Sequence, residues 1–126
     1  MQAKSVYELV GGEAAFRLLV DRFYDGVAAD PVLRPLYPEP DLSGARDRLR
    51  MFLVQYWGGP TTYDDLRGHP RLRMRHAPFA IGTAEREAWL RHMASAVRSL
   101  SLDRRIEARL MEYFEATATA MMNSPA

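Results

Sequence analysis

The chain has 126 residues, 48% of them hydrophobic, and this length and composition fit a single domain spanning 1–126. Its 17 basic and 16 acidic residues leave a net charge of +1, which argues against nucleic acid as a partner because such binding needs a concentrated basic surface. The absence of cysteine excludes disulfides, thiol catalysis, iron–sulfur clusters and cysteine zinc sites, and it fits a cytoplasmic location, which we expect. No run of 18 apolar residues and no apolar secretory core is present, so we expect neither a transmembrane helix nor a signal peptide.

The hydrophobic pattern predicts an all-α fold, with four main amphipathic helices and no alternating strand pattern. Ser5-Val6-Tyr7-Glu8 has the form of a capping box, so a short first helix is expected to begin there and to end at Gly11-Gly12. The first long helix is expected over 13–29, because its apolar residues recur at steps of three and four and therefore share one face. These residues are Phe16, Leu19, Val20, Phe23, Tyr24 and Val27.

Prolines and glycines mark the next boundaries. Asp30-Pro31 reads as an N-cap with proline in the first turn, which predicts a short helix. Tyr37-Pro38-Glu39-Pro40 must end it, because proline lacks the amide donor. A helix over 43–57 follows and stops at Gly58-Gly59-Pro60. Its apolar stripe consists of Ala45, Leu49, Phe52, Leu53 and Tyr56.

A loop-rich segment over 60–82 opens the second half and is expected to contain one short helical piece that ends near Pro78. Segments of this length inside a compact domain are often functional. Helices over 83–100 and 102–122 complete the predicted fold. Their apolar faces are Trp89, Met93, Ala96, Val97 and Leu100 in the first, and Ile106, Leu110, Phe114, Thr117, Ala118 and Met121 in the second.

Two of the three histidines lie in the loop-rich segment. His69 precedes Pro70, which favours an extended backbone and a role in a loop or a cap. His92 lies at the edge of an apolar helix face and is interpreted as a boundary residue. Three histidines without cysteine and without a His-Glu-x-x-His pattern give no convergent zinc site. The sequence also lacks a phosphate-binding loop and a nucleophile elbow.

His76 differs from the other two in its surroundings. It follows Leu72 by four residues, so both would point to one side of a short helix, which Pro78 ends. A neutral imidazole ligates haem iron, and cations suit the two haem propionates. Such cations would come from Arg71, Arg73 and Arg75. The other interpretation is a partly buried histidine near a helix end, and spacing alone favours that one.

Three aromatic residues with polar groups could shape a pocket. Tyr24 lies on an apolar helix face, Tyr37 at the end of the short helix, and Trp89 on the helix after the histidine segment. Ordinary core packing explains each of them taken singly. Together they could present three hydrogen-bond donors to one small ligand, with Ala45 and Leu49 as apolar walls.

Motifs spread over the whole chain match one protein family. They are Val10-Gly11-Gly12, Phe23-Tyr24, Val32-Leu33-Arg34 with Tyr37-Pro38, Arg48-Leu49-Arg50-Met51-Phe52-Leu53, Gln55-Tyr56-Trp57-Gly58-Gly59-Pro60, the run from Gly68 to Phe79, Trp89, and Asn123-Ser124-Pro125. In this combination the chain resembles the group II truncated haemoglobins over about residues 4–125, with the actinobacterial branch the nearest in character.

The resemblance implies a truncated globin fold, a two-over-two helical sandwich around haem. It implies that His76 is the proximal iron ligand. Tyr24, Tyr37 and Trp89 match the polar aromatic residues that stabilise a ligand on the distal side.

The resemblance also assigns residues around the haem. Ala45 and Leu49 match positions of the distal pocket, and Phe23 is placed with them although its periodicity indicates core packing. Leu72 is expected against the porphyrin, and Arg48 and Arg75 are the candidates for binding the propionates.

The function implied is haem b with oxygen or another diatomic ligand at the iron, slow oxygen release, and redox chemistry. Oxygen-dependent removal of nitric oxide and peroxide reduction are both compatible with this, so the enzymatic activity stays open. The alternatives are a haem-free helical interaction module and a haem-based ligand sensor or oxygen store. An unidentified reductase and a homodimer are further partners that the sequence leaves open.

Overall fold

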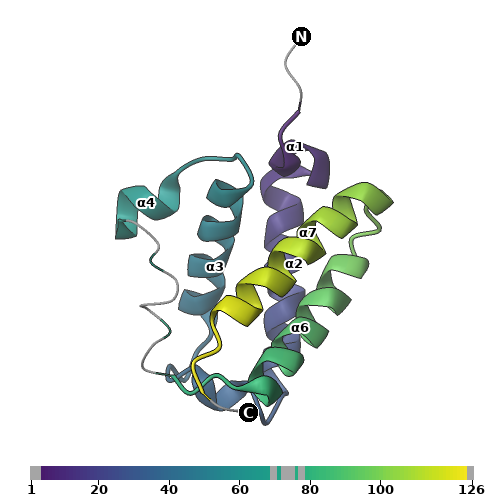
Figure 1. The fold of residues 1–126 in the computed structure, drawn as a ribbon. Coiled ribbons are helices and arrows are strands. Elements are labelled where there is room, and N and C mark those ends of the chain that lie inside the picture. The colour runs from purple at the N-terminus through teal and green to yellow at the C-terminus, as the bar shows by residue number, and fades with distance from the viewer. Residues whose placement is uncertain (1–3, 69–70, 72–75, 77–78, 125–126) are drawn as a thin grey trace.

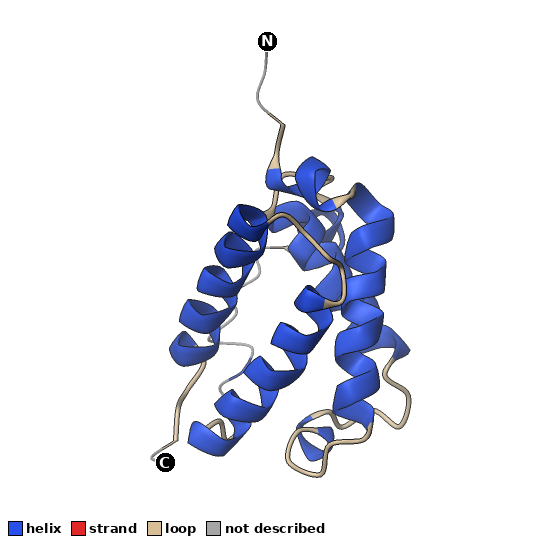
Figure 2. Cartoon of the chain, turned by 90° about the vertical axis from the view of Figure 1, so that its right-hand side faces the viewer, coloured by secondary structure: helices blue, strands red, loops and turns tan. Residues whose placement is uncertain are grey.

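In the computed structural model, the residues described are 4–68, 71, 76 and 79–124. Their fold is helical, and no strand occurs in this part of the chain, as Figure 2 shows. The elements are α1 (Val6–Val10), α2 (Gly12–Ala28), the 3-10 helix η1 (Arg34–Leu36), α3 (Ser43–Tyr56), α4 (Thr62–Arg67), α6 (Thr83–Arg98) and α7 (Arg104–Ala120). The all-α fold class is therefore confirmed.

Two helix pairs form the body of the molecule. Helix α2 packs on α3, α6 packs on α7, and the pairs meet where α2 contacts α6. Helix α7 passes in front of α2 in Figure 1. This arrangement is the two-over-two helical sandwich that the family resemblance implies.

Helix α2 has the apolar face expected from its periodicity. Phe16, Leu19, Phe23 and Val27 are fully enclosed in the core. The helix can begin directly after α1 because Gly11 has a φ of +125°, in a region that side chains other than glycine rarely adopt.

The cap of α1 lies where the sequence predicts it. The Ser5 Oγ accepts a hydrogen bond from the Glu8 backbone N–H at 3.2 Å. The Tyr7 N–H donates to the Trp57 carbonyl at 2.9 Å, which ties α1 to the end of α3.

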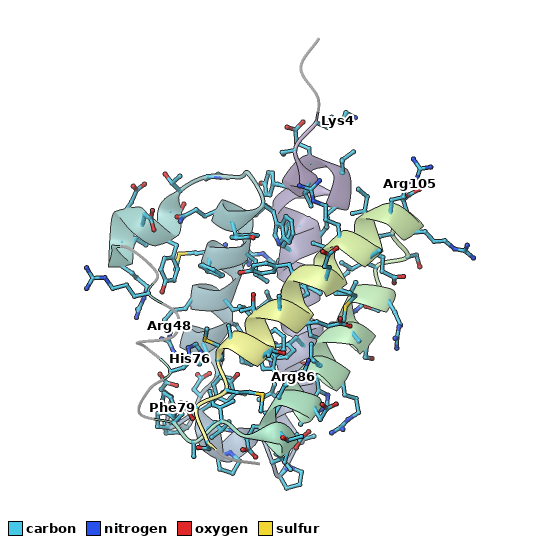
Figure 3. All side chains as sticks on the ribbon, in the orientation of Figure 1. Lys4, Arg48, His76, Phe79, Arg86 and Arg105 are labelled. Carbon is cyan, nitrogen blue, oxygen red and sulfur yellow. The ribbon has the colours of Figure 1, made fainter. Side chains whose placement is uncertain are left out.

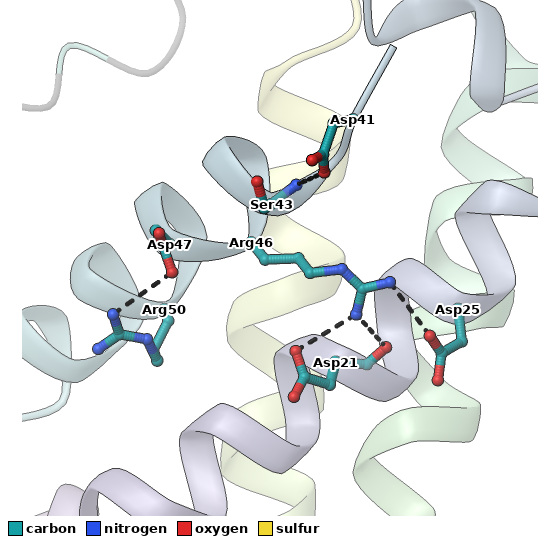
Figure 4. A network of polar contacts seen from close by, with 7 residues as sticks. All are labelled: Asp21, Asp25, Asp41, Ser43, Arg46, Asp47 and Arg50. Carbon is teal, nitrogen blue, oxygen red and sulfur yellow. Dashed lines mark hydrogen bonds and ion pairs between the residues drawn. The ribbon is translucent and has the colours of Figure 1, made fainter. Parts of the chain in front are cut away.

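A cluster of charged side chains fixes α3 against α2 (Figure 4). The Arg46 guanidinium donates to the Asp21 carbonyl at 3.0 Å and to the Asp25 carboxylate at 3.1 Å. At the start of α3, the Asp41 carboxylate accepts from the Ser43 N–H at 2.7 Å. The face of α3 that carries Ala45 is thereby turned toward the core, where Ala45 is buried.

The N-cap predicted at Asp30 is present, because its Oδ1 accepts from the Val32 N–H at 2.8 Å, and the short helix expected after it is a turn followed by the 3-10 helix η1. Two other local expectations were wrong. Helix α4 lies in the segment expected to be loop, since six residues are too few to show periodicity. Tyr56, expected on the buried stripe of α3, is 50% exposed at the last residue of that helix.

No helix among the described residues is both long and apolar enough to cross a lipid bilayer.

Candidate functional site

A cavity of about 560 Å³ lies between the helix pairs and is walled by α2, α3, α4, α6, α7 and the segments that precede α3 and α6. Its size is within the range of small-molecule and cofactor sites. Most of the lining surface is apolar, and half of the lining residues carry a polar side-chain group. Among its lining residues are Leu33, Phe52, Leu53, Phe79, Ile81, Phe114, Ala118 and Met121.

The three polar aromatic residues selected from the sequence all line this cavity. The Tyr24 and Tyr37 rings meet edge to face, with centroids 5.5 Å apart. The Trp89 ring, on α6, meets the Phe114 ring of α7 edge to face, with centroids 5.8 Å apart. Segments far apart in sequence thus bring these residues together at one site.

Ala45 and Leu49 also line the cavity, but Phe23 does not. The Phe23 ring lies behind the wall, 5.0 Å from the Tyr24 ring and 5.3 Å from the Trp89 ring between centroids. Its position agrees with the core packing that its periodicity indicates, and it supports two of the lining residues from behind.

Burial controls the protonation of the two tyrosines. The pKa of Tyr24 is raised well above its ordinary value of 10.0, first by burial and then by the neighbouring Tyr37. Burial also raises the pKa of Tyr37. Both hydroxyls therefore keep their protons at neutral pH and can act as hydrogen-bond donors.

His76 is half-buried and lines the same cavity. Its backbone is fixed from two directions, because its carbonyl accepts from the Phe79 N–H at 3.0 Å and from the Asn123 Nδ2 at 3.3 Å. Figure 3 shows His76 and Phe79 close together in the same part of the molecule as Arg48.

Asn123 connects the end of the chain to the segment that follows His76. Its Nδ2 also donates to the Phe79 carbonyl at 2.8 Å, and its Oδ1 accepts from the Ile81 N–H at 2.9 Å. Asn123 was noted in the sequence only as part of a terminal motif. The partners of its amide are more than 40 residues away, so nothing local could have revealed them.

Arginines border the cavity. Arg48, predicted to bind a propionate, lines it and donates to the Glu39 carboxylate at 3.0 Å. Arg67 and Arg86 line it as well, and sequence reasoning missed both. Arg86 is oriented by the Thr119 hydroxyl, which accepts from its Nε at 2.8 Å. Of the remaining predictions, His69, Leu72 and Arg75 lie outside the described residues.

Tyrosines in the cavity wall were also missed. Tyr63 comes from α4, which the sequence did not predict, and Tyr113 comes from α7, beside the apolar stripe and not within it. The adjacent Phe114 was the only signal pointing to Tyr113.

Comparison with known proteins decides the family. Residues 5–123 match the model of the bacterial-like globins. The chain is 41% identical over 117 residues to the group 2 truncated hemoglobin YjbI of Bacillus subtilis, an alignment that covers 93% of this chain and 87% of that protein. The chain belongs to the group II truncated haemoglobins.

Solved structures agree with this assignment. A thermostable hemoglobin from the actinobacterium Thermobifida fusca is 58% identical, with a TM-score of 0.95 over 98% of this chain and 100% of that one. A truncated oxygen-avid haemoglobin from Bacillus subtilis is 40% identical, with a TM-score of 0.89 over 95% and 100% of the two chains.

A truncated haemoglobin binds diatomic ligands such as oxygen at haem iron. Membership of this family therefore excludes the alternative of a haem-free interaction module. The cavity of this truncated haemoglobin fits the cofactor. His76 is the one imidazole among its described lining residues, the walls are mainly apolar, and arginines stand at its border. The described residues hold no cluster of three or more His, Asp or Glu side chains suited to a bare metal ion.

Proposed function

We propose that this truncated haemoglobin holds haem b through His76, releases oxygen slowly, and carries out redox chemistry on its ligand. The observation that carries the proposal is the cavity itself, in which one imidazole and three polar aromatic side chains from four parts of the chain meet in an apolar setting. Haem iron bound there would supply a coordination position for a diatomic ligand and the electrons for its reduction.

The distal residues would act on the ligand by hydrogen bonding. A diatomic ligand that draws electron density becomes a better acceptor, and donors already in place stabilise that charge strongly where water is excluded. The Tyr24 and Tyr37 hydroxyls both stay protonated and are hydrogen-bonded to each other, so the pair can offer one proton to the ligand. The Trp89 indole is a further donor, and it is a donor only.

Several hydrogen-bond donors acting together favour retention of bound oxygen over its delivery. One hydrogen bond contributes about 0.5–1.5 kcal/mol, which corresponds to about a 2- to 10-fold slower release of the ligand. A protein that retains oxygen in this way is a poor carrier, which supports nitric oxide removal or peroxide reduction. The description of the Bacillus subtilis relative as oxygen-avid also supports retention.

The proximal side and the border would hold the cofactor. The Asn123 amide fixes the backbone at His76 and thereby limits where the imidazole can lie. Arg48 is proposed to bind a propionate, together with Arg75 and the apolar contact from Leu72. Repeated turnover would need an external reductase or small reductant. We also propose a cytoplasmic location, because the sequence lacks cysteine.

The proposal is tested by oxygen release from the haem-loaded protein. Trp89→Phe keeps the ring and removes the N–H donor, and we expect its oxygen off-rate to rise about 2- to 10-fold. Trp57→Phe is the matched control, because Trp57 does not line the cavity. Absence of a Soret band from the wild-type protein, or an unchanged off-rate in Trp89→Phe, would contradict the proposal.

A further inference from the structure

The backbone of Tyr37 has both of its polar groups bonded to one residue, Arg34. The Tyr37 N–H donates to the Arg34 carbonyl at 3.2 Å, and the Tyr37 carbonyl accepts from the Arg34 guanidinium at 2.7 Å. Arg34 is the first residue of η1 and does not line the cavity, whereas Tyr37 does. The position of this cavity-lining tyrosine therefore depends on a residue outside the cavity.

The same guanidinium donates to carbonyls further along the segment that leads to α3. Its Nη2 lies 2.9 Å from the Glu39 carbonyl oxygen and 3.1 Å from that of Pro40. Arg34 is half-buried, and in the described part of the chain its side-chain hydrogen bonds all go to backbone carbonyls. A planar guanidinium, with its donors in a fixed fork, suits the bridging of several acceptors at once.

The amino-acid sequence of this segment explains why a side chain is needed there. Pro38 and Pro40 have no backbone N–H, so the segment cannot bond its own carbonyls in a regular pattern. Backbone carbonyls that are removed from water need a donor from elsewhere. Arg34 supplies donors to three of them. In the sequence, Arg34 was noted only as part of a family motif and received no role.

A second attachment of the segment runs through Glu39. Its carboxylate accepts from Arg48 of α3 at 3.0 Å, and both residues line the cavity. Both side chains are partly exposed, and ion pairs of this kind contribute little. Hydrogen bonds donated by a charged group are stronger than neutral ones, so the bonds from Arg34 are the main attachment.

We propose that Arg34 is a positioning residue for the distal site, which prolongs oxygen retention by holding Tyr37 in place. This inference rests on the proposed contact between Tyr37 and the ligand. The Tyr37 hydroxyl is hydrogen-bonded to that of Tyr24, and the ring centroids are 5.5 Å apart. A donor stabilises charge on a ligand only when it is already oriented toward it. Without the guanidinium, the Tyr37 carbonyl loses its anchor, and the tyrosine pair is less firmly oriented.

The test compares haem-loaded Arg34→Met, which keeps an unbranched stem and removes the donors, with the wild-type protein. Amide hydrogen exchange over residues 37–41 should become faster, because these bonds protect the segment from opening. The oxygen off-rate should rise by about 2- to 10-fold, and by no more than in Tyr37→Phe. In the Tyr37→Phe background, Arg34→Met should cause no further rise, because the donor through which Arg34 acts is already absent.

Two further variants guard against a loss of stability alone. Arg22→Met is the matched control, because Arg22 also donates to a carbonyl, that of Ser99 at 3.0 Å, and does not line the cavity. It should keep the wild-type off-rate. If Arg34→Met does not fold, Arg34→Lys replaces it, because lysine keeps the charge but lacks the planar fork. Its off-rate and amide exchange should change in the same direction by a smaller amount.

The possible failures are distinguishable. An unchanged off-rate or unchanged amide exchange in the Arg34 variant that folds overturns the inference and leaves the proposed function intact. The same holds if Arg34→Met raises the off-rate further in the Tyr37→Phe background, or if Arg22→Met raises it equally. An unchanged off-rate in Tyr37→Phe alone refutes the proposed contact between Tyr37 and the ligand, and this inference with it.

Discussion

Replacing Asn123 by alanine should loosen the segment that carries His76. The substitution deletes the three side-chain hydrogen bonds that join Asn123 to this segment, two donated to the carbonyls of His76 and Phe79 and one accepted from the Ile81 N–H. It also deletes a longer bond accepted from the hydroxyl of the adjacent Ser124. Its backbone bond, in which the Asn123 N–H donates to the Ile81 carbonyl at 2.9 Å, can persist in the variant. The effect should therefore reach His76 through its backbone.

The magnitude follows from the exposure of these bonds. A protein hydrogen bond contributes about 0.5–1.5 kcal/mol net, and the lower end applies here because Asn123 is exposed. Three such bonds give about 1–2 kcal/mol, which corresponds to a Tm lower by about 4–8 °C for a domain of this size. The imidazole would also be less firmly positioned, so haem should be lost faster.

Two assays check this prediction. Thermal unfolding followed by circular dichroism gives the Tm, and transfer of haem to an excess of an apo-globin acceptor gives the rate of haem loss. Ser124→Ala is the matched control, because it removes one exposed bond to the Asn123 Oδ1 at 3.3 Å and leaves the three others in place. If Asn123→Ala has the Tm and haem-loss rate of the wild-type protein, the claim that the Asn123 side chain fixes the backbone at His76 is refuted.

Three further predictions concern other parts of the molecule. The pKa of the Asp30 carboxyl is lowered, first by its hydrogen bond with His92. The ionised carboxylate therefore stabilises the fold above the unfolded-state pKa, and this stabilisation is lost as the pH falls through the folded-state pKa. Asp30→Asn should therefore make stability less dependent on pH in the acid range, and identical acid-unfolding curves would argue against this. Tyr37→Phe should raise the oxygen off-rate by about 2- to 10-fold in stopped-flow measurements, and a rate equal to the wild-type value would remove Tyr37 from the ligand contacts. Gly59→Ala should cost about 1–3 kcal/mol in chemical denaturation, because a Cβ there would lie 2.7 Å from Val54 Cγ1, and an unchanged midpoint would show that the chain adjusts freely.

Long periodic segments were the easiest to predict from sequence. The stripe of α2 repeats over 17 residues, and every residue assigned to its apolar face is buried. Helix α4 has six residues, too few for a repeat, and was missed for that reason. Its charges, with Asp64 in the first turn and Arg67 in the last, were the only helix signal available.

The site was harder to derive from the residues. Spacing alone favoured ordinary packing for Tyr24, Tyr37 and Trp89, because a polar aromatic residue on an apolar face is common in any core. Their convergence on one cavity depends on how α2, η1 and α6 pack, which no local pattern encodes. The family motifs supplied that information. Tyr113 and Asn123 remained hidden because the partners of both lie far away in the sequence.

The central claim is that His76 holds the haem iron. Resonance Raman spectroscopy of the ferrous, ligand-free protein tests it most directly, since the iron–histidine stretching band reports the bond itself. We expect a band in the wild-type protein that shifts when its histidines carry ¹⁵N, persists in His92→Gln, and is absent from His76→Gly. The same band in His76→Gly would show that the ligand lies elsewhere and would contradict the claim.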